Sequence, residues 1–199
     1  MKEFKLNEIR EKTIKQEIKE ILYKDGVIVY PTDTLYGIGG NFFSIKVIKK
    51  IDYFKQRKDQ PYSIIIPDIN FLNNIAIFNH DQLQILKKNL PGKFTFILNA
   101  KKSIDQSLLK NRNTIGIRIP DIKEILNLVK FLGFPLITTS VNKSDRNPLN
   151  DPEEIKVEFS EIDILINNGI LKISKGSTIV DLTKKNPIII RQGDGEFIY

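Results

Sequence analysis

The stretch "VIVYPTDTLYGIGG", residues 27–40, begins as an apolar β-strand and ends in a cluster of polar side chains. Val27 to Tyr30 form a run of residue types that is typical of a buried strand. Pro31 breaks this run, and two threonines, an aspartate and a tyrosine follow before three glycines. A plain turn needs fewer polar groups. The stretch therefore predicts a strand end that faces a ligand, with glycines that let the backbone approach it.

Length and composition limit the kinds of fold and site that the chain can form. The 199 residues, 41% of them hydrophobic, predict a single domain, residues 1–199, with a sizeable core. The absence of cysteine excludes a disulfide framework, thiol catalysis and a Cys-ligated zinc or iron–sulfur site. The one histidine, His80, cannot form a multi-histidine metal site, and we expect it on the surface just before a helix.

The charged N-terminus, "MKEFKLNEIREKTIKQEIKE", has no apolar segment typical of a signal peptide. No apolar run approaches the roughly 20 residues of a membrane span, so we expect a cytoplasmic protein without a membrane partner. The chain has 31 Lys and Arg against 24 Asp and Glu, a net charge of +7. This excess favours a nucleotide, a nucleic acid or another phosphate compound as partner, although a lysine-rich chain also gains solubility from it.

Hydrophobic spacing predicts helices and strands in mixed order. The predicted helices cover residues 8–24, 44–55, 81–90, 121–132 and 151–157, with Ser44 as an N-cap. The predicted strands cover residues 27–30, 62–67, 93–100, 114–120, 135–140, 162–167, 177–182 and 187–192. Since neither strict alternation nor an internal repeat is present, the pattern predicts one α/β domain on a mixed sheet.

Polar groups collect where several predicted strands end. Arg118 lies within the apolar run "GIRIP", "TTSVN" ends the strand at 135–140, and Arg191 ends the last strand. A buried charge is costly without a partner, so each arginine either faces solvent or meets an anion. Their combination with hydroxyl-rich strand ends favours a ligand crevice of the kind that open α/β sheets form.

The segment "FKQRKDQPYS", residues 54–63, adds Lys55, Arg57 and Lys58 at a helix end. Such cations complement the helix dipole, and they also suit a phosphate clamp, so both interpretations stay open. Neither a Walker motif nor a G-x-G-x-x-G motif is present in the sequence.

Seven motifs occur in one order: "YPTDTLYGIGG", "KQR", "PGKFTFIL", "TIGIRIP", "TTSVN", "STIVDL" and "IIIRQGD". From about residue 10 to its end, the chain resembles the YrdC-like threonylcarbamoyl-AMP synthases of the single-domain TsaC type. The resemblance implies a twisted open mixed β-sheet with flanking helices and a deep basic cavity. It also implies a nucleotidyltransferase that converts L-threonine, bicarbonate and ATP to threonylcarbamoyl-adenylate and pyrophosphate.

The same resemblance implies a role in tRNA modification. The product would feed the threonylcarbamoyladenosine modification of tRNAs that read ANN codons. We expect it to pass to a tRNA threonylcarbamoyltransferase complex, with weak tRNA binding by the chain itself. Mg²⁺ would bridge the ATP phosphates, and the resemblance implies neither a protein-held metal nor a prosthetic group.

Residue by residue, the resemblance implies three overlapping sets of site residues. The catalytic set is Lys55, Arg57, Ser140 and Asn142. The ATP-binding set is Lys55, Arg57, Thr114, Asn142 and Arg191. The L-threonine-binding set is Thr32, Thr34, Tyr36, Arg118, Ser140, Ser177 and Thr178.

Three positions depart from the family pattern. The segment after Arg57 is about one residue shorter, Asp145 stands where glycine is usual, and Lys93 stands where proline is common. None of these departures affects the family's Lys-x-Arg pair, Lys55 and Arg57, or its Ser-x-Asn pair, Ser140 and Asn142.

The implied reaction needs little acid–base catalysis by side chains. Its main barriers are the repulsion between anionic reactants and the need to orient them, and a site lowers both by positioning the reactants and supplying positive charge.

Three alternative functions remain: an RNA-binding module that uses a basic concavity, a domain like that of hydrogenase maturation proteins, and a paralogue with another substrate.

Overall fold

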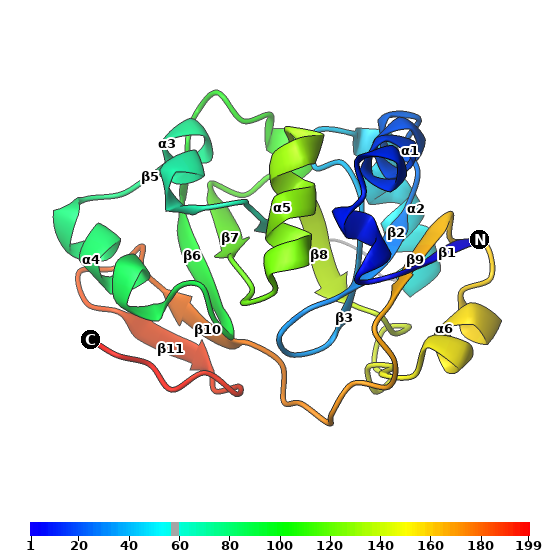
Figure 1. The fold of residues 1–199 in the computed structure, drawn as a ribbon. Helices are drawn as coiled ribbons and strands as arrows, with labels where there is room; N and C mark the ends of the chain where they lie inside the picture. The colour runs from blue at the N-terminus through cyan, green and yellow to red at the C-terminus, as the bar shows by residue number, and fades with distance from the viewer. Residues whose placement is uncertain (57–59) are drawn as a thin grey trace.

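A mixed β-sheet runs through the molecule, and helices pack on its faces (Figure 1). The computed structural model describes residues 1–56 and 60–199. Its eleven strands follow the order β1-β9-β2-β3-β8-β4-β7-β6-β10-β11, with β5 paired to β6. The predicted single α/β domain on an open mixed sheet is therefore confirmed.

The strands are β1 Lys2–Lys5, β2 Ile28–Pro31, β3 Tyr36–Gly39, β4 Ser63–Ile65, β5 Ala76–Ile77, β6 Phe94–Ala100, β7 Thr114–Arg118, β8 Leu136–Ser140, β9 Ile164–Asn167, β10 Thr178–Asp181 and β11 Ile188–Arg191. The α-helices are α1 Lys12–Tyr23, α2 Ile45–Lys55, α3 Leu72–Ile75, α4 His80–Asn89, α5 Lys123–Leu132 and α6 Pro152–Glu158. Short 3₁₀ turns cover Glu8–Arg10, Ile69–Phe71 and Gln106–Leu109.

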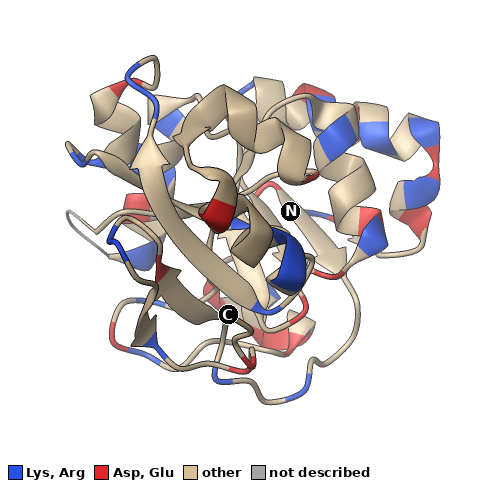
Figure 2. Ribbon diagram, turned by 90° about the vertical axis from the view of Figure 1, so that its left-hand side faces the viewer, with Lys and Arg blue, Asp and Glu red and all other residues tan. Residues whose placement is uncertain are grey.

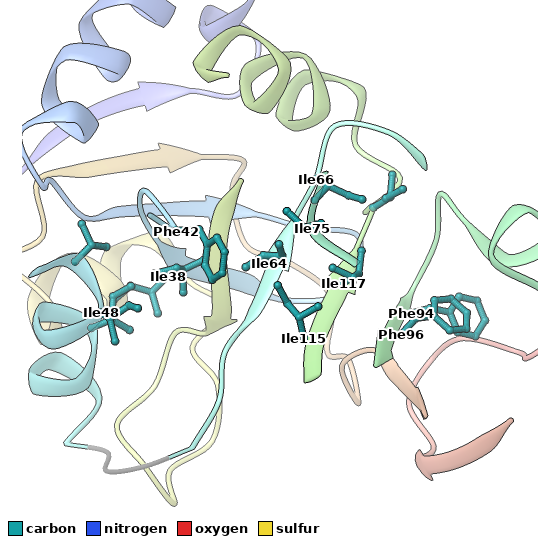
Figure 3. Close-up of a cluster of buried hydrophobic side chains, with 14 of the residues drawn as sticks. Ile38, Phe42, Ile48, Ile64, Ile66, Ile75, Phe94, Phe96, Ile115 and Ile117 are labelled. Carbon is teal, nitrogen blue, oxygen red and sulfur yellow. The ribbon is translucent and has the colours of Figure 1, made fainter. Parts of the chain in front are cut away.

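Strand alternation divides the core between the two faces of the sheet. On one face, α1 and α5 cover Ile28, Tyr30 and Ile65, all fully buried. On the other face, α2 packs its apolar side against β3 near Ile38, and the same buried cluster continues across the sheet to Ile64 of β4 and Ile117 of β7 (Figure 3). Each fully buried isoleucine contributes about 2 kcal/mol of transfer free energy, so both layers hold the sheet in place.

Most predicted elements are confirmed within a few residues at their ends. Ser44 is the N-cap of α2, and its side chain accepts a hydrogen bond from the Val47 N–H. His80 is exposed, as expected, but it is the first residue of α4 rather than the residue before it. Asn79 caps that helix in a capping box with Gln82, so the helix begins one position earlier than predicted.

The sequence prediction missed several short elements. Strand β3, "YGIG", lies between β2 and β8, although its glycines are depleted in strands generally. Strand β1, "KEFK", lies at the end of the sheet, where lysine is common because an edge must resist further pairing. The predicted helix 8–24 is divided into a 3₁₀ turn and α1, with Glu11 between them.

Basic and acidic residues are interspersed along the helices (Figure 2). Much of the charge excess therefore lies on solvated helix surfaces, which supports the solubility interpretation for that share of it. In the described part of the chain, none of the helices has the length and apolar character needed to cross a bilayer.

Candidate functional site

A cavity of about 440 Å³ opens where the central strands of the sheet end. Segments far apart in the chain meet around it, so it exists only in the folded protein. Its walls come from residues 34–37, 60–63, 138–140 and 174–177, together with Thr95, Arg118 and Arg191.

Small side chains form the floor of this cavity. Ser63 pairs with Gly116 on one side and with Thr138 on the other, and Gly37 pairs with Ser140. A Cβ atom at Gly116 would lie 2.7 Å from Oγ of Ser63, closer than real atoms approach. A side chain at residue 116 would therefore displace the Ser63 hydroxyl, which lines the cavity.

Arg118 and Asp33 form a buried ion pair at one end of the cavity. Nη2 of Arg118 donates to Oδ1 of Asp33 at 3.0 Å and to Oγ1 of Thr34 at 3.1 Å. Burial lowers the pKa of the Arg118 guanidinium, and the Asp33 charge opposes that shift. Nε of Arg118 is buried and has no hydrogen-bond partner among the described residues, so a donor remains for an anionic ligand.

The hydroxyl groups of Thr32 and Tyr36 form hydrogen bonds within the protein. Oγ1 of Thr32 donates to the Leu35 carbonyl at 2.6 Å, which closes the turn that carries Thr34. The Tyr36 ring lines the cavity, but its hydroxyl donates to the Gly169 carbonyl at 2.8 Å and accepts from Asn168 N–H. Burial raises the pKa of Tyr36, so this phenol remains neutral at ordinary pH.

Arg191 brings a second cation to the same cavity. Its Nη2 donates to the Ser177 carbonyl at 2.7 Å, and the Ser177 hydroxyl lies 2.8 Å from that of Thr95. Burial lowers the pKa of Arg191, and the charge of Arg118 lowers it further. Because two guanidinium groups repel each other across the cavity and Asp33 compensates one of them, an anion between them would be stabilised.

A smaller chamber of about 320 Å³ adjoins the first and shares Gln60 and Ser140 with it. Its other lining residues include Lys55, Asn142 and Asp145. The two chambers are therefore neighbours, with Ser140 at the boundary between them.

The structure brings together most residues that the family resemblance implied. Thr34, Tyr36, Arg118, Ser140, Ser177 and Arg191 line the larger chamber, and Lys55, Ser140 and Asn142 line the smaller one. Arg57 lies outside the described residues, as does the start of the shortened segment after it.

Three other implied residues do not line either chamber. Thr32 is buried within its turn, and Thr114 lies on the cavity face of β7 but at its far end from Arg118. Thr178 points to the opposite face from Ser177, where its hydroxyl donates to the Gly195 carbonyl at 2.8 Å. These positions support structural roles for Thr32 and Thr178.

The residue sets implied by the resemblance omit Asp33, Ser63, Thr95 and Thr138, although the polar strand ends noted in the sequence include Asp33 and Thr138. Thr95 interrupts the apolar run between Phe94 and Phe96, which is a recognisable signal. Thr138 lies two positions before Ser140, and strand alternation puts both on one face. Only the sheet order reveals that Ser63 lies between Thr138 and Gly116.

A larger hollow of about 750 Å³ lies beside α2 and the end of α6. Four of the charged side chains that line it form pairs, since Lys110 contacts Asp52 and Lys143 lies 3.8 Å from Glu158. A ligand there would meet compensated charges, whereas the strand-end cavity offers a buried donor. The strand-end cavity is therefore the stronger candidate site.

Comparison with known proteins identifies the family of the chain. Residues 20–193 match the family described as "Telomere recombination", that of Sua5, YciO and YrdC. An uncharacterised protein of Haemophilus influenzae is 35% identical over 181 residues, covering 88% of this chain and 87% of that protein. A putative threonylcarbamoyl-AMP synthase of Methanocaldococcus jannaschii is 34% identical over 195 residues, covering 97% and 92%.

The crystal structure of Escherichia coli YciO superimposes with a TM-score of 0.86 at 30% identity, covering 94% of this chain and 92% of that one. The chain belongs to the Sua5–YciO–YrdC family. This family includes threonylcarbamoyl-AMP synthases as well as YciO proteins whose function is uncharacterised.

Proposed function

We propose that this member of the Sua5–YciO–YrdC family is an L-threonylcarbamoyladenylate synthase, a nucleotidyltransferase that acts on L-threonine, bicarbonate and ATP. The observation that carries the proposal is the pair of neighbouring chambers, with Arg118 and Arg191 in one and Lys55 beside the other. Such a site suits two anionic substrates that must react with each other. The relative named as a putative synthase agrees with this activity, while the YciO relatives leave it open.

The end of the larger chamber near Arg118 would bind the amino acid. The unpartnered Nε of Arg118 suits the substrate carboxylate, and an ionic hydrogen bond of this kind is worth about 1.5–3 kcal/mol. The hydroxyls of Ser177 and Thr95 lie 2.8 Å apart on the cavity wall and would bind the small polar side chain.

ATP would occupy the smaller chamber and extend towards Arg191. The positive charges of Lys55 and Arg191 would offset part of the triphosphate charge. The described residues hold no group of three or more acidic or histidine side chains, so Mg²⁺ would enter with the nucleotide and be bound mainly by its phosphates. Ser140, at the boundary, would lie beside the reacting groups.

The reaction would need two bond-forming steps. The threonine amine attacks the carbon of bicarbonate, water leaves, and a carbamate forms. A carbamate oxygen then attacks the α-phosphate of ATP, and pyrophosphate leaves with the bonding electron pair. Holding reactants in orientation supplies about 7–11 kcal/mol in favourable intramolecular cases, so a site that positions anions needs no side-chain nucleophile.

Pyrophosphate release from ATP in the presence of bicarbonate and Mg²⁺ tests the proposal. We expect release with L-threonine to exceed release with L-serine or without amino acid. The Arg118→Met variant should raise the KM for threonine at least tenfold, while Lys87→Met, at an exposed position of α4, should match the native protein.

Other outcomes would identify the alternatives. Release with a different amino acid but not with threonine would favour a paralogue that adenylates another substrate. Salt-dependent RNA affinity without any amino-acid-dependent turnover would favour the RNA-binding module. Either result would overturn the synthase proposal, as would absence of release by folded protein.

The biological role would follow from the product. Threonylcarbamoyl-adenylate would pass to a tRNA threonylcarbamoyltransferase for the modification of tRNAs that read ANN codons. We propose this partner only together with the synthase activity, since nothing else in the site identifies a macromolecule.

A further inference from the structure

We propose that Lys55 and Asn142 are positioning residues that lock the turn of residues 140–146, rather than direct contacts to the nucleotide. The inference deepens the proposed function and rests on it only for the effect on nucleotide affinity. The structural part, a turn held by these two side chains, stands on the contacts of the protein alone.

The Lys55 ammonium group uses its three N–H bonds within the protein. Nζ lies 2.6 Å from the Ser140 carbonyl, 2.9 Å from the Asn142 carbonyl and 2.9 Å from Oδ1 of Asn142. An ammonium has three donors and no acceptor. Lys55 is also only 2% exposed, so a phosphate oxygen could reach Nζ only if one of these bonds broke.

The Asn142 side chain is likewise saturated. Oδ1 accepts from Nζ of Lys55 at 2.9 Å and from the Ser140 hydroxyl at 2.6 Å. Nδ2 donates to the carbonyls of Lys143 at 2.9 Å and Arg146 at 2.8 Å. A primary amide offers two donors and one oxygen with two lone pairs, and all four are used.

The main chain completes the connection in the other direction. The Ser144 N–H donates to the Lys55 carbonyl at 2.8 Å, and the Arg146 N–H donates to the Lys143 carbonyl at 3.1 Å. The C-terminal end of α2 and the turn therefore hold each other through both side-chain and main-chain bonds. Fully satisfied networks of this kind rigidify the backbone around them.

This arrangement changes how the two residues would act on ATP. Lys55 would contribute its charge from beneath the turn, and Asn142 would fix the turn's shape. Other residues of the turn that line the smaller chamber are Ser140, Ser144 and Asp145. Loss of either positioning residue would disturb the chamber as a whole, and so would weaken every nucleotide that binds there.

Hydrogen exchange without any ligand tests the structural part. In Lys55→Met, which keeps the length of the side chain, we expect the amides of Val141, Ser144 and Arg146 to exchange at least about tenfold faster, because a lost ionic hydrogen bond is worth 1.4 kcal/mol or more. Lys49→Met, an exposed position on the same helix, is the matched control and should leave them unchanged. Unchanged protection in Lys55→Met would overturn the proposal.

Asn142→Asp provides a second variant if Lys55→Met does not fold. It keeps the acceptor that faces Lys55 but loses both Nδ2 donors, so the amides of Ser144 and Arg146 should again exchange faster. Protection equal to that of the native protein would also count against the proposal.

Calorimetric affinities for ATP and AMP separate positioning from direct contact. We expect Lys55→Met to weaken both nucleotides, because the whole chamber is disturbed, with a loss for ATP that exceeds the loss for AMP by less than tenfold, since only the indirect effect of the charge differs between them. A loss at least tenfold larger for ATP than for AMP would indicate a direct contact to the β- or γ-phosphate and would overturn the proposal. Absence of nucleotide binding by the native protein would refute the proposed function instead, and the exchange result would still decide the role of the turn.

Discussion

Arg118 and Asp33, 85 positions apart in the chain, form an ion pair of 3.0 Å between Nη2 and Oδ1 with both side chains at most 10% exposed. Oδ2 of Asp33 also accepts from the Asp121 N–H at 3.1 Å, so the carboxylate joins β7 to the start of α5. One carboxylate thus fixes the arginine that faces the cavity and balances part of its charge.

The Asp33→Ala variant should lose about 3–5 kcal/mol of unfolding free energy, since removal of one partner leaves a buried charge uncompensated. Urea unfolding at pH 7 measures this loss. Arg118→Met combined with Asp33→Ala should recover part of it, because neither charge then remains buried. Additive losses in the double variant would show that the two residues stabilise the protein independently.

The Gly116→Ala variant should narrow the floor of the larger chamber. The new Cβ would lie 2.7 Å from the Ser63 hydroxyl oxygen and 3.3 Å from its Cβ, so the hydroxyl must move from its place in the chamber lining. We expect at least tenfold weaker threonine binding by calorimetry. Removal of the nearer atom in Gly116→Ala/Ser63→Ala should restore much of the affinity, and failure to do so would exclude this contact as the cause.

The Asp145→Asn variant should bind ATP about two- to threefold more tightly at low salt, because it removes an exposed negative charge from the rim of the smaller chamber. Residue 145 has a φ of 62°, a left-handed conformation that asparagine tolerates, so the backbone should not change. The gain should vanish at about 0.5 M salt. A gain that persists there would indicate a change of shape rather than of charge.

The Ser174→Ala variant should loosen the segment that forms one wall of the larger chamber. Oγ of Ser174 donates to Oδ2 of Asp194 at 2.6 Å, and this bond is the main cause of the lowered pKa of Asp194. A carboxyl with a lowered folded-state pKa stabilises the fold above its unfolded pKa, and the contribution is lost as the pH falls through the folded value.

Thermal unfolding across pH tests this dependence. At pH 7 the variant should be less stable by about 1 kcal/mol, and the difference from the native protein should shrink as acid protonates Asp194. Ser103→Ala, an exposed serine elsewhere, serves as the matched control. A stability difference that does not vary with pH would contradict the role assigned to the carboxylate.

The sequence predicted local structure more completely than it predicted the site. Helix α2 follows from the spacing of Val47, Ile48 and Ile51 and from the cap at Ser44, all within one segment. Strand β3 was missed because "YGIG" has poor strand propensity and forms only between β2 and β8. The hydrogen-bond network between α2 and the 140–146 turn was missed for a similar reason. Nothing in the segments "KQR" and "SVN" predicts that their side chains bond to each other.

Local sequence patterns are enough to predict the apolar faces of the helices and strands, because side-chain direction follows the local periods of helix and strand. The sequence also contains the motifs that place the chain in its family. The contacts between polar groups, in contrast, arise from the tertiary fold. Strand β8 lies between β3 and β4, and β10 pairs with β6, so Ser140 lies beside Gly37 and Ser177 beside Thr95. Such partners depend on the order and register of distant strands, which the packing of the whole chain selects and no single segment encodes.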